Sequence, residues 1–413
     1  MLLFISDLHL TDTADRSTVD LTRIAEALNG QLLRATRRKG IREVKLVLLG
    51  DIFELLKSRI WLDRGLRPWD RPTSAHVQAV ADIFEAVLQA NRPFLEDLCQ
   101  LTQTYPVKLE YLPGNHDLYF NTEMGVQARR RLQELLPLPR RDGEPFETIL
   151  LDDGHSVMAK HGHEWDPTNR YGEETAAIGD AVVVEILLRL PILVAAALGT
   201  SEDDPRLGFL HELDNVRPHH PKALAHWLLT GLDGLGQMGP QTRRALDSGL
   251  SNLVQDLMAL TDRVKFGSIR EMRWWELFLL RTAKAVLKSK ILSAAVRFPM
   301  GGEEGPTSYR QDALLALDSA LVLGRDLRYI LCGHTHLHEL VPLEVSRAGP
   351  SPLYINTGTW RRTHRQAEVS SRGRHRTFST WLEECLICIF DSEEQRQGFP
   401  PYEVHRCTCG RAD

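Results

Sequence analysis

Short apolar runs of strand length recur along the chain and alternate with longer segments of helical period. Five runs rich in Val, Ile and Leu predict buried strands, at residues 2–6, 44–49, 107–112, 157–160 and 327–332. Segments that repeat apolar residues at three and four positions predict helices, at about residues 17–38, 74–104 and 124–136. Three further strand-like runs follow, at residues 339–343, 353–356 and 378–390. This order predicts an α/β fold with two packed sheets flanked by helices.

The pattern changes in the middle of the chain, between residues 167 and 324. This stretch is mainly of helical period, and a structureless loop of such length is improbable within a compact domain. We therefore expect a core domain formed by residues 1–166 and 325–413, interrupted by a helical insertion or lid subdomain at 167–324.

Two segments of the insertion have distinctive patterns. Residues 181–198 are rich in Val, Ile, Leu and Ala, but charged residues and Pro191 leave too short an uncharged run to span a bilayer. We expect a buried helix that is kinked at Pro191. Residues 269–292 combine tryptophans with arginines and lysines. Such a helix either makes peripheral contact with an anionic membrane or packs its apolar side within the insertion.

Residues able to bind metal follow each of the first five strand-like runs. Their carboxylate, amide and imidazole groups belong to Asp7 and His9, Asp51, Asn115 to Asp117, His161, and His334 and His336. Because the carboxyl ends of strands in open α/β sheets form the usual ligand crevice, we expect one shared site. Two divalent cations there could neutralise a phosphoryl group and acidify water, and an imidazole could protonate the leaving oxygen. These are the requirements for hydrolysis of a phosphate ester.

Five short motifs together resemble the calcineurin-like metallophosphoesterase superfamily: Asp7-Leu8-His9, Gly50-Asp51, Gly114-Asn115-His116-Asp117, His161-Gly162-His163 and Gly333-His334-Thr335-His336. The resemblance covers approximately residues 1–166 and 325–391 and leaves the insertion unmatched. It implies a four-layer αββα sandwich of two mixed sheets. It also implies a binuclear metal-dependent enzyme that hydrolyses phosphate mono- or diesters by in-line attack of a metal-bridging hydroxide.

The resemblance assigns a role to each matched position. One metal ion would be bound by Asp7, His9 and His336, and the second by Asn115, His161 and His334. Asp51 would bridge the two ions. His116 would stabilise the phosphoryl group and protonate the leaving oxygen, and Asp117 would orient its imidazole.

The ligand types limit the choice of metal. Oxygen and imidazole groups without thiolate suit Mn²⁺, iron or Zn²⁺. The superfamily commonly uses manganese or iron, so the resemblance implies two divalent ions, with Mn²⁺ as the expected one. A separate group of thiols could hold a structural zinc: Cys385, Cys388, Cys407 and Cys409. We favour buried cysteines acting as small hydrophobes, because Cys385 and Cys388 are three apart on an expected strand and would face opposite sides.

Arg361 and Arg362 begin a basic cluster soon after the His336 group. A guanidinium presents a planar fork that matches phosphate oxygens, so both are candidates for substrate binding. The alternative is a solvated hairpin, and the sequence does not separate the two.

Other functions on the same fold stay open. Residues 4–10 and 50–54 resemble the branch that cleaves the pyrophosphate of a nucleotide-linked acylated glucosamine, but that branch carries Arg where this chain has His116. That branch also has His-Gly-Asp where this chain has His161-Gly162-His163, and its insertion is far smaller. A nucleotide-sugar or lipid-linked pyrophosphatase is therefore kept as an alternative and not as the leading function. A nuclease would use stacking and basic residues such as Trp61, Arg64, Arg67 and Trp69. A non-catalytic scaffold is less favoured because the whole ligand set is present.

The composition is that of an ordinary globular protein, with 413 residues, 43 % of them hydrophobic, and a formal charge of −5. This charge does not favour nucleic acid as a partner. Asp7 is reached without a basic leader or a long apolar region, and the six cysteines are scattered. We therefore expect a cytoplasmic protein without a transmembrane segment, acting on a phosphate ester. The oligomeric state does not follow from the pattern.

Overall fold

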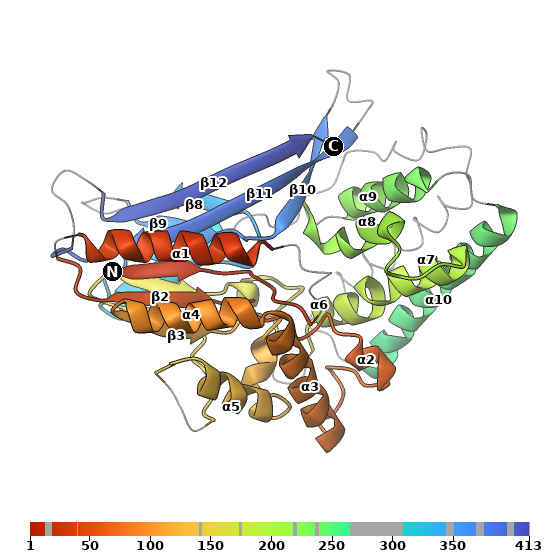
Figure 1. The fold of residues 1–413 in the computed structure, drawn as a ribbon, viewed down its shortest axis with the longest axis horizontal. Coiled ribbons are helices and arrows are strands. Elements are labelled where there is room, and N and C mark those ends of the chain that lie inside the picture. The colour runs from red at the N-terminus through yellow and green to blue at the C-terminus, as the bar shows by residue number, and fades with distance from the viewer. Residues whose placement is uncertain are drawn as a thin grey trace.

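The computed structural model describes residues 1–412 apart from 13–18, 39, 140–142, 173–175, 218–220, 236–238, 265–308, 344–350, 369–375 and 395–399. Within these residues the chain has a mixed α/β fold with two mixed sheets, as the sequence predicts (Figure 1). The first sheet has the order β3-β2-β1-β11-β10-β6, with β12 paired to β11. Its strands are β1 (Leu2–Ile5), β2 (Val44–Leu49), β3 (Val107–Leu112), β6 (Val216–Arg217), β10 (Arg362–Glu368), β11 (Arg376–Ile389) and β12 (Tyr402–Ala412).

The second sheet has the order β4-β5-β7-β9-β8. It consists of β4 (Ile149–Asp152), β5 (Val157–Lys160), β7 (Tyr329–Cys332), β8 (His338–Pro342) and β9 (Leu353–Thr357). Strands β1 to β3 pair in parallel in the first sheet, and β5 and β7 pair in parallel in the second. The predicted ligands therefore leave parallel strands of both sheets at their carboxyl ends.

An apolar layer joins the two sheets. Leu2 and Phe4 of β1 share one buried cluster with Leu331 of β7 and Ile355 of β9. The alternate residues Leu3 and Ile5 belong to the cluster under the helices, because side chains alternate between the faces of a strand. Four helices contribute apolar side chains to that cluster: α1 (Leu21–Thr36), α3 (Ser74–Ala90), α4 (Arg92–Thr104) and α5 (Val126–Leu135). Helix α13 (Arg310–Val322) packs against the second sheet.

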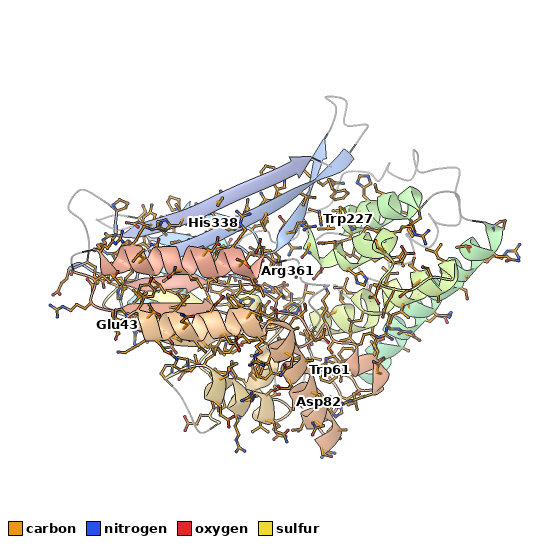
Figure 2. All side chains as sticks on the ribbon, in the orientation of Figure 1. Glu43, Trp61, Asp82, Trp227, His338 and Arg361 are labelled. Carbon is orange, nitrogen blue, oxygen red and sulfur yellow. The ribbon has the colours of Figure 1, made fainter. Side chains whose placement is uncertain are left out.

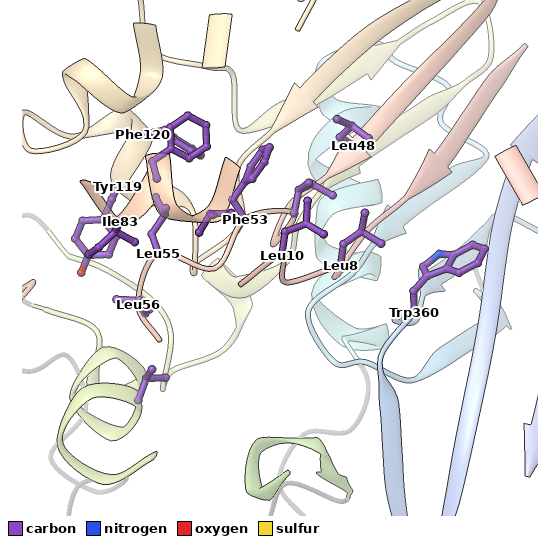
Figure 3. Close-up of a cluster of buried hydrophobic side chains, with 14 of the residues drawn as sticks. Leu8, Leu10, Leu48, Phe53, Leu55, Leu56, Ile83, Tyr119, Phe120 and Trp360 are labelled. Atoms are coloured by element: carbon purple, nitrogen blue, oxygen red, sulfur yellow. The ribbon is translucent and has the colours of Figure 1, made fainter. Parts of the chain in front are cut away.

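Apolar side chains anchor the loops that carry the predicted ligands (Figure 3). Leu8 lies between Asp7 and His9 in the chain, and Phe53 follows Asp51; both are fully buried in the cluster under the helices. The Phe53 ring makes edge contacts with Phe84 and Phe120, at centroid distances of 5.3 and 5.8 Å. These contacts hold the loops after β1 and β2 in place beneath the site.

Most predicted elements are confirmed, with differences that have local causes. The segment at 74–104 is two helices, α3 and α4, separated at Asn91, whose side chain donates to Thr11 O at 2.8 Å. Pro93 stands in the first turn of α4, where its missing N–H costs nothing. Strands β4, β6, β10 and β12 were not predicted. Strand β10 is largely polar, so its extended form depends on pairing with β11 rather than on an apolar pattern.

The insertion is mainly helical within its described residues, as expected. It contains α6 (Ile178–Ala181), η4 (Val182–Leu187), α7 (Arg189–Leu198), η5 (Pro205–Leu207), α8 (Gly208–His211), η6 (Leu213–Asn215), α9 (Pro221–Gly234) and α10 (Pro240–Arg263). Figure 1 shows these helices gathered at one end of the sheets. Other short helices among the described residues are α2 (Ile60–Asp63), η2 (Leu118–Asn121) and η3 (His163–Trp165).

Strand β6 ties the insertion to the core. Val216 and Arg217 pair in parallel with His364 and Arg365 of β10. Trp227 of α9 stacks on the His364 ring, with centroids 4.2 Å apart. The insertion thus adds a strand to the first sheet and shares the apolar cluster of the core.

The apolar segment of the insertion differs in detail from its prediction. A π-helical turn, Val182–Leu187, precedes Pro191, which lies within α7. Pro191 offers no N–H to the carbonyl of Leu187, the last residue of that turn. The expectation that the run is too short for a bilayer is wrong, because Ile178–Leu198 is long and apolar enough by length and composition. However, 67 % of its most apolar window is buried, as in a core helix.

Two further predictions concern regions away from the site. The basic helix at residues 269–292, on which peripheral membrane contact rests, lies outside the described residues. Cys385 packs in the layer between the sheets, whereas Cys388 packs under the helices, so the two thiols face opposite sides of β11 as predicted. Burial raises the pKa of each thiol to about 12.

Candidate metal centre

The predicted ligands have backbone conformations that L-residues rarely adopt. Five of them have a positive φ between 46° and 71°: Asp7, His9, Asp51, His334 and His336. Among the described residues, the other non-glycine residue with positive φ is Ser156. Such conformations cost on the order of 1–3 kcal/mol each and cluster at functional sites. Their concentration at these positions is independent evidence that the five residues act together.

The first group of ligand atoms comes from the loops after β1 and β7. One atom from each of Asp7, His9 and His336 lies within 4.8 Å of the others. His336 Nε2 is 3.3 Å from Asp7 Oδ1 and 3.0 Å from His9 Nε2. His9 Nδ1 is 3.1 Å from Glu54 Oε2, which leaves its Nε2 directed at the group. The three residues predicted to share one ion therefore converge.

Asp51 lies between this first group and a second one. Its Oδ2 is 3.7 Å from His9 Nε2 and 3.2 Å from His161 Nε2. Asp51, His161 and His334 form the second group, again with ligand atoms within 4.8 Å of one another. His161 Nδ1 is 2.9 Å from the Leu49 carbonyl, so Nε2 is the nitrogen that faces the centre. The position of Asp51 suits a carboxylate shared by both groups.

Buried polar atoms at the centre lack partners. Within the described residues, Asn115 Oδ1 and His336 Nδ1 have no hydrogen-bond partner, and His161 Nε2 forms no hydrogen bond of acceptable geometry, although Asp51 Oδ2 lies 3.2 Å away. An unpaired buried polar atom costs about 1–3 kcal/mol, so native structures rarely contain several close together. A divalent cation would satisfy Asn115 Oδ1 and His161 Nε2. Since the donors are oxygen and imidazole without thiolate, these residues fit Mn²⁺, iron or Zn²⁺.

Glycines stand where the ligands approach the backbone. A Cβ atom at Gly114 would lie 2.2 Å from Asp51 Oδ1, and one at Gly333 would lie 2.4 Å from Asp7 Oδ2. Any side chain at these two positions would displace a candidate metal ligand. Glycine at these two positions therefore lets the carboxylates of Asp51 and Asp7 lie close against the backbone.

His116 lies beside the centre, and its partner is Glu54. His116 Nδ1 is 2.8 Å from Glu54 Oε1, and the backbone N–H of His116 donates to Asp51 Oδ1 at 2.8 Å. The His116 and His9 rings are in edge contact, with centroids 4.6 Å apart. Glu54 was not predicted as a site residue. It stands three residues after Asp51, within the segment 50–54 that resembles one branch of the superfamily.

The predicted role of Asp117 is wrong. Its carboxylate accepts hydrogen bonds from four backbone amides, those of Gly114, Asp51, Ile52 and Phe53, at 2.6 to 3.3 Å. These bonds tie the loop after β3 to the loop after β2. Asp117 therefore shapes the backbone that presents Asp51 and Asn115, while Glu54 orients the His116 imidazole.

The charges around His116 favour its protonated form. Burial disfavours the imidazolium, but the carboxylates of Glu54 and Asp51 outweigh burial and raise the pKa of His116 to about 9. Burial likewise opposes ionisation of Glu54, yet the His116 and His9 rings hold the pKa of its carboxyl well below the usual range. Glu54 and His116 thus form a charged pair at the edge of the centre.

His334 has a carboxylate partner that the sequence did not reveal. Its Nε2 is 3.0 Å from Asp166 Oδ2. Asp166 is in turn fixed by the Thr168 backbone N–H and by the Asn169 amide, both at 2.8 Å. Because Asp166 occupies Nε2, Nδ1 is the nitrogen of His334 left for an ion. Asp166 lies at the last position of the predicted first core segment, outside the recognisable words.

The two predicted substrate-binding arginines differ in position. Arg361 is 4 % exposed, and its charge adds to burial in lowering the pKa of His9 to about 4. Arg362, by contrast, has a side chain 53 % exposed, with Nη1 3.9 Å from Glu212 Oε1. The structure brings Arg361 to the centre and does not bring Arg362 there.

The insertion also reaches the centre. Asp214 Oδ2 binds Arg361 at 3.0 Å, and Arg217 Nε donates to Thr335 O, between the two candidate ligands His334 and His336, at 3.3 Å. Neither insertion residue was predicted, because no local sequence pattern links them to contact partners more than a hundred residues away in the chain.

Comparison with family models gives no match, and no curated protein is significantly similar to the chain.

Proposed function

We propose that this chain is a phosphoesterase that depends on two divalent metal ions and belongs to the calcineurin-like metallophosphoesterase superfamily, with its αββα core. One observation carries the proposal. Carboxylate and imidazole residues with strained backbone conformations converge around buried polar atoms that lack hydrogen-bond partners. Such strain and desolvation are tolerated where function requires them. Hydrolysis of a phosphate mono- or diester is the reaction that this donor set supports best.

Metal ions bound here would neutralise phosphoryl oxygens and lower the pKa of water. The residues of one ion would be Asp7, His9 and His336, and those of the other Asn115, His161 and His334, with Asp51 shared. Mn²⁺ is the ion we propose first.

The protein itself supplies the proton for the leaving group. His116, paired through Nδ1 with Glu54, would hold a proton on Nε2 and donate it to the departing oxygen of the ester. Glu54 fixes the ring orientation and stabilises the imidazolium before transfer. Arg361, held by Asp214, would contribute positive charge beside the phosphoryl oxygens.

The nuclease alternative has less support. Trp61 is fully buried and donates to Leu55 O at 2.9 Å, so its ring is not available for stacking on a base. Arg64 and Arg67 are paired with Asp82 and Glu185. These residues hold the segment after β2 against α3 and the insertion.

The test uses the full chain, stripped of metal and reloaded with Mn²⁺. We expect cleavage of p-nitrophenyl phosphate or of bis(p-nitrophenyl) phosphate, and bound metal close to two ions per chain by elemental analysis. Asp51→Asn should lose metal and activity together. His116→Ala should keep its metal and lose about 10²- to 10⁴-fold in kcat. A reloaded wild-type protein that binds manganese but cleaves neither ester would rule out the proposal.

A further inference from the structure

The insertion begins beside the candidate metal centre. It meets the core at the junction where Figure 2 shows Arg361, which the insertion residue Asp214 binds. Its first described residues form a turn at 167–169, and α6 follows from Ile178. Asn169 stands at the end of this turn, and the roles assigned above to the residues of the centre do not include it.

The Asn169 side chain lies between two candidate ligands of the second ion. Its Oδ1 accepts a hydrogen bond from Asn115 Nδ2 at 3.5 Å, and its Nδ2 lies 3.4 Å from His334 Nε2. Nδ2 also donates at 2.8 Å to Asp166 Oδ2, the oxygen that faces His334. One amide group therefore contacts Asn115, His334 and the carboxylate partner of His334.

The contact with Asn169 determines which atom of Asn115 faces the ion. The two ends of an amide differ, because the nitrogen only donates hydrogen bonds whereas the oxygen can bind a cation. Asn115 gives its Nδ2 to Asn169, which leaves Oδ1 unpaired. Within the described residues this is the one hydrogen bond of the Asn115 side chain. Without Asn169, the Asn115 amide would be free to turn away from the ion.

Helix α6 of the insertion supports Asn169 from behind. A Cβ atom at Gly179 would overlap Asn169 Oδ1 and lie 3.0 Å from Asn169 Cγ. The Gly179 N–H donates to Thr168 O at 2.9 Å, so α6 lies directly against the turn. The missing side chain of Gly179 therefore leaves the space that the Asn169 amide occupies.

A buried carboxylate fixes α6 to the core. Asp180 of α6 is 1 % exposed and accepts hydrogen bonds from the hydroxyls of Tyr119 and Tyr171, the latter at 2.6 and 2.8 Å. Tyr119 belongs to η2, which follows directly after the loop that carries Asn115. The position of Asn169 over the centre thus depends on how the start of the insertion packs against this loop.

We propose that Asn169 is a positioning residue for the second metal ion, and that through it the insertion controls how tightly this ion is held. Asn169 orients the amide of Asn115 and keeps Asp166 against His334, and it does not itself bind the ion. This inference rests on the proposed function, from which it takes the two-metal centre.

The test is a titration of the metal-free full chain with Mn²⁺, followed by calorimetry. The wild type should show two binding steps. Asn169→Ala should weaken one step by about 10- to 100-fold, as is typical when the partner of a metal ligand is lost, and leave the other within about threefold. In the Asn115→Ala background the same change should have a smaller effect, because part of its action passes through Asn115.

Gly179→Ala tests the contact from behind. The added methyl group pushes on Asn169 without reaching a ligand, and alanine is favourable in a helix, so the change should weaken the same binding step. In the Asn169→Ala background the overlap is absent, and Gly179→Ala should then add nothing. Full additivity of the two changes would mean that they act on the ion independently, which overturns the inference.

The matched control is Asn121→Ala, which removes a partly buried amide that pairs with the Phe146 backbone through two hydrogen bonds of 2.8 Å. It should lower the melting temperature and leave both binding steps unchanged, so that general loss of stability is separated from positioning. Two unchanged steps for Asn169→Ala, or equal weakening of both, would overturn the inference.

The binding measurement involves no turnover. A chain that binds two manganese ions and responds to these changes as expected, but cleaves no ester, would therefore contradict the proposed function alone. A wild-type chain without two binding steps would contradict both.

Discussion

Glu54 and His116 form an ion pair at the edge of the candidate metal centre, with 2.8 Å between Oε1 and Nδ1. The other oxygen of the same carboxylate lies 3.1 Å from Nδ1 of His9. One side chain therefore orients both a candidate metal ligand and the candidate acid. In the proposed mechanism, Glu54 would therefore couple metal binding by His9 to proton donation by His116.

Glu54→Gln should lower kcat while largely keeping KM, because the neutral amide cannot stabilise the His116 imidazolium. We expect a loss of about 10- to 100-fold, typical for the partner of a functional histidine. Steady-state kinetics with p-nitrophenyl esters, accompanied by metal analysis, measure it. The matched control is Glu43→Gln, an exposed carboxylate paired with Lys108, which should behave as wild type. Wild-type kinetics for Glu54→Gln would refute the assigned role.

Asp117→Ala should act mainly on stability. It removes the acceptor of four backbone N–H groups that join the loops after β2 and β3, and each unsatisfied buried amide costs about 1–3 kcal/mol. We expect a fall of several degrees in the melting temperature and loss of metal. Differential scanning fluorimetry and elemental analysis check both. A variant with wild-type melting and only a reduced kcat would restore Asp117 as the orienting partner of His116.

Asp166→Asn should weaken binding of the ion that His334 holds. The amide keeps the shape but makes the Nε2 partner of His334 neutral, and loss of such a partner typically costs about 10- to 100-fold in metal affinity. Titration of the metal-free protein with Mn²⁺ should show one weakened and one unchanged binding step. Two unchanged steps would remove Asp166 from the centre.

We expect the ion pairs of His155, which lies away from the centre, to make a pH-dependent contribution to the folding stability of the protein. Its Nδ1 lies 2.9 Å from Asp152 Oδ1 and its Nε2 3.4 Å from Glu394 Oε2. Burial opposes its charge, but these carboxylates outweigh it and raise the pKa of His155 to about 9. Since the pKa is higher in the folded chain than the ordinary value of about 6.5, the stabilisation is full below pH 6.5 and is lost as pH rises through about 9.

The measurement is the melting temperature of wild type and His155→Gln between pH 6 and pH 10. The difference between the two should be largest near pH 6 and should shrink toward pH 10. A constant difference across this range would show that the ion pairs of His155 do not contribute to stability.

Local sequence patterns and long-range contacts determine different parts of this fold. The strands β1, β2, β3, β5 and β7 could be predicted, as could the convergence of the candidate ligands that follow them, because both signals are local: an apolar run and then a polar motif. The same reasoning failed at Asp117, since adjacency in the chain does not decide which way a carboxylate points.

The sequence by itself determined the α/β class, the strands that precede the candidate ligands and which side chains could serve as metal ligands, since hydrophobic periodicity and ligand chemistry are properties of short segments. Only the tertiary structure decided that Glu54 pairs with His116, that Arg361 rather than Arg362 faces the centre, and that Arg217 reaches it from the insertion. These relationships depend on loop geometry and on pairing between β6 and β10, which are long-range contacts that no local pattern encodes.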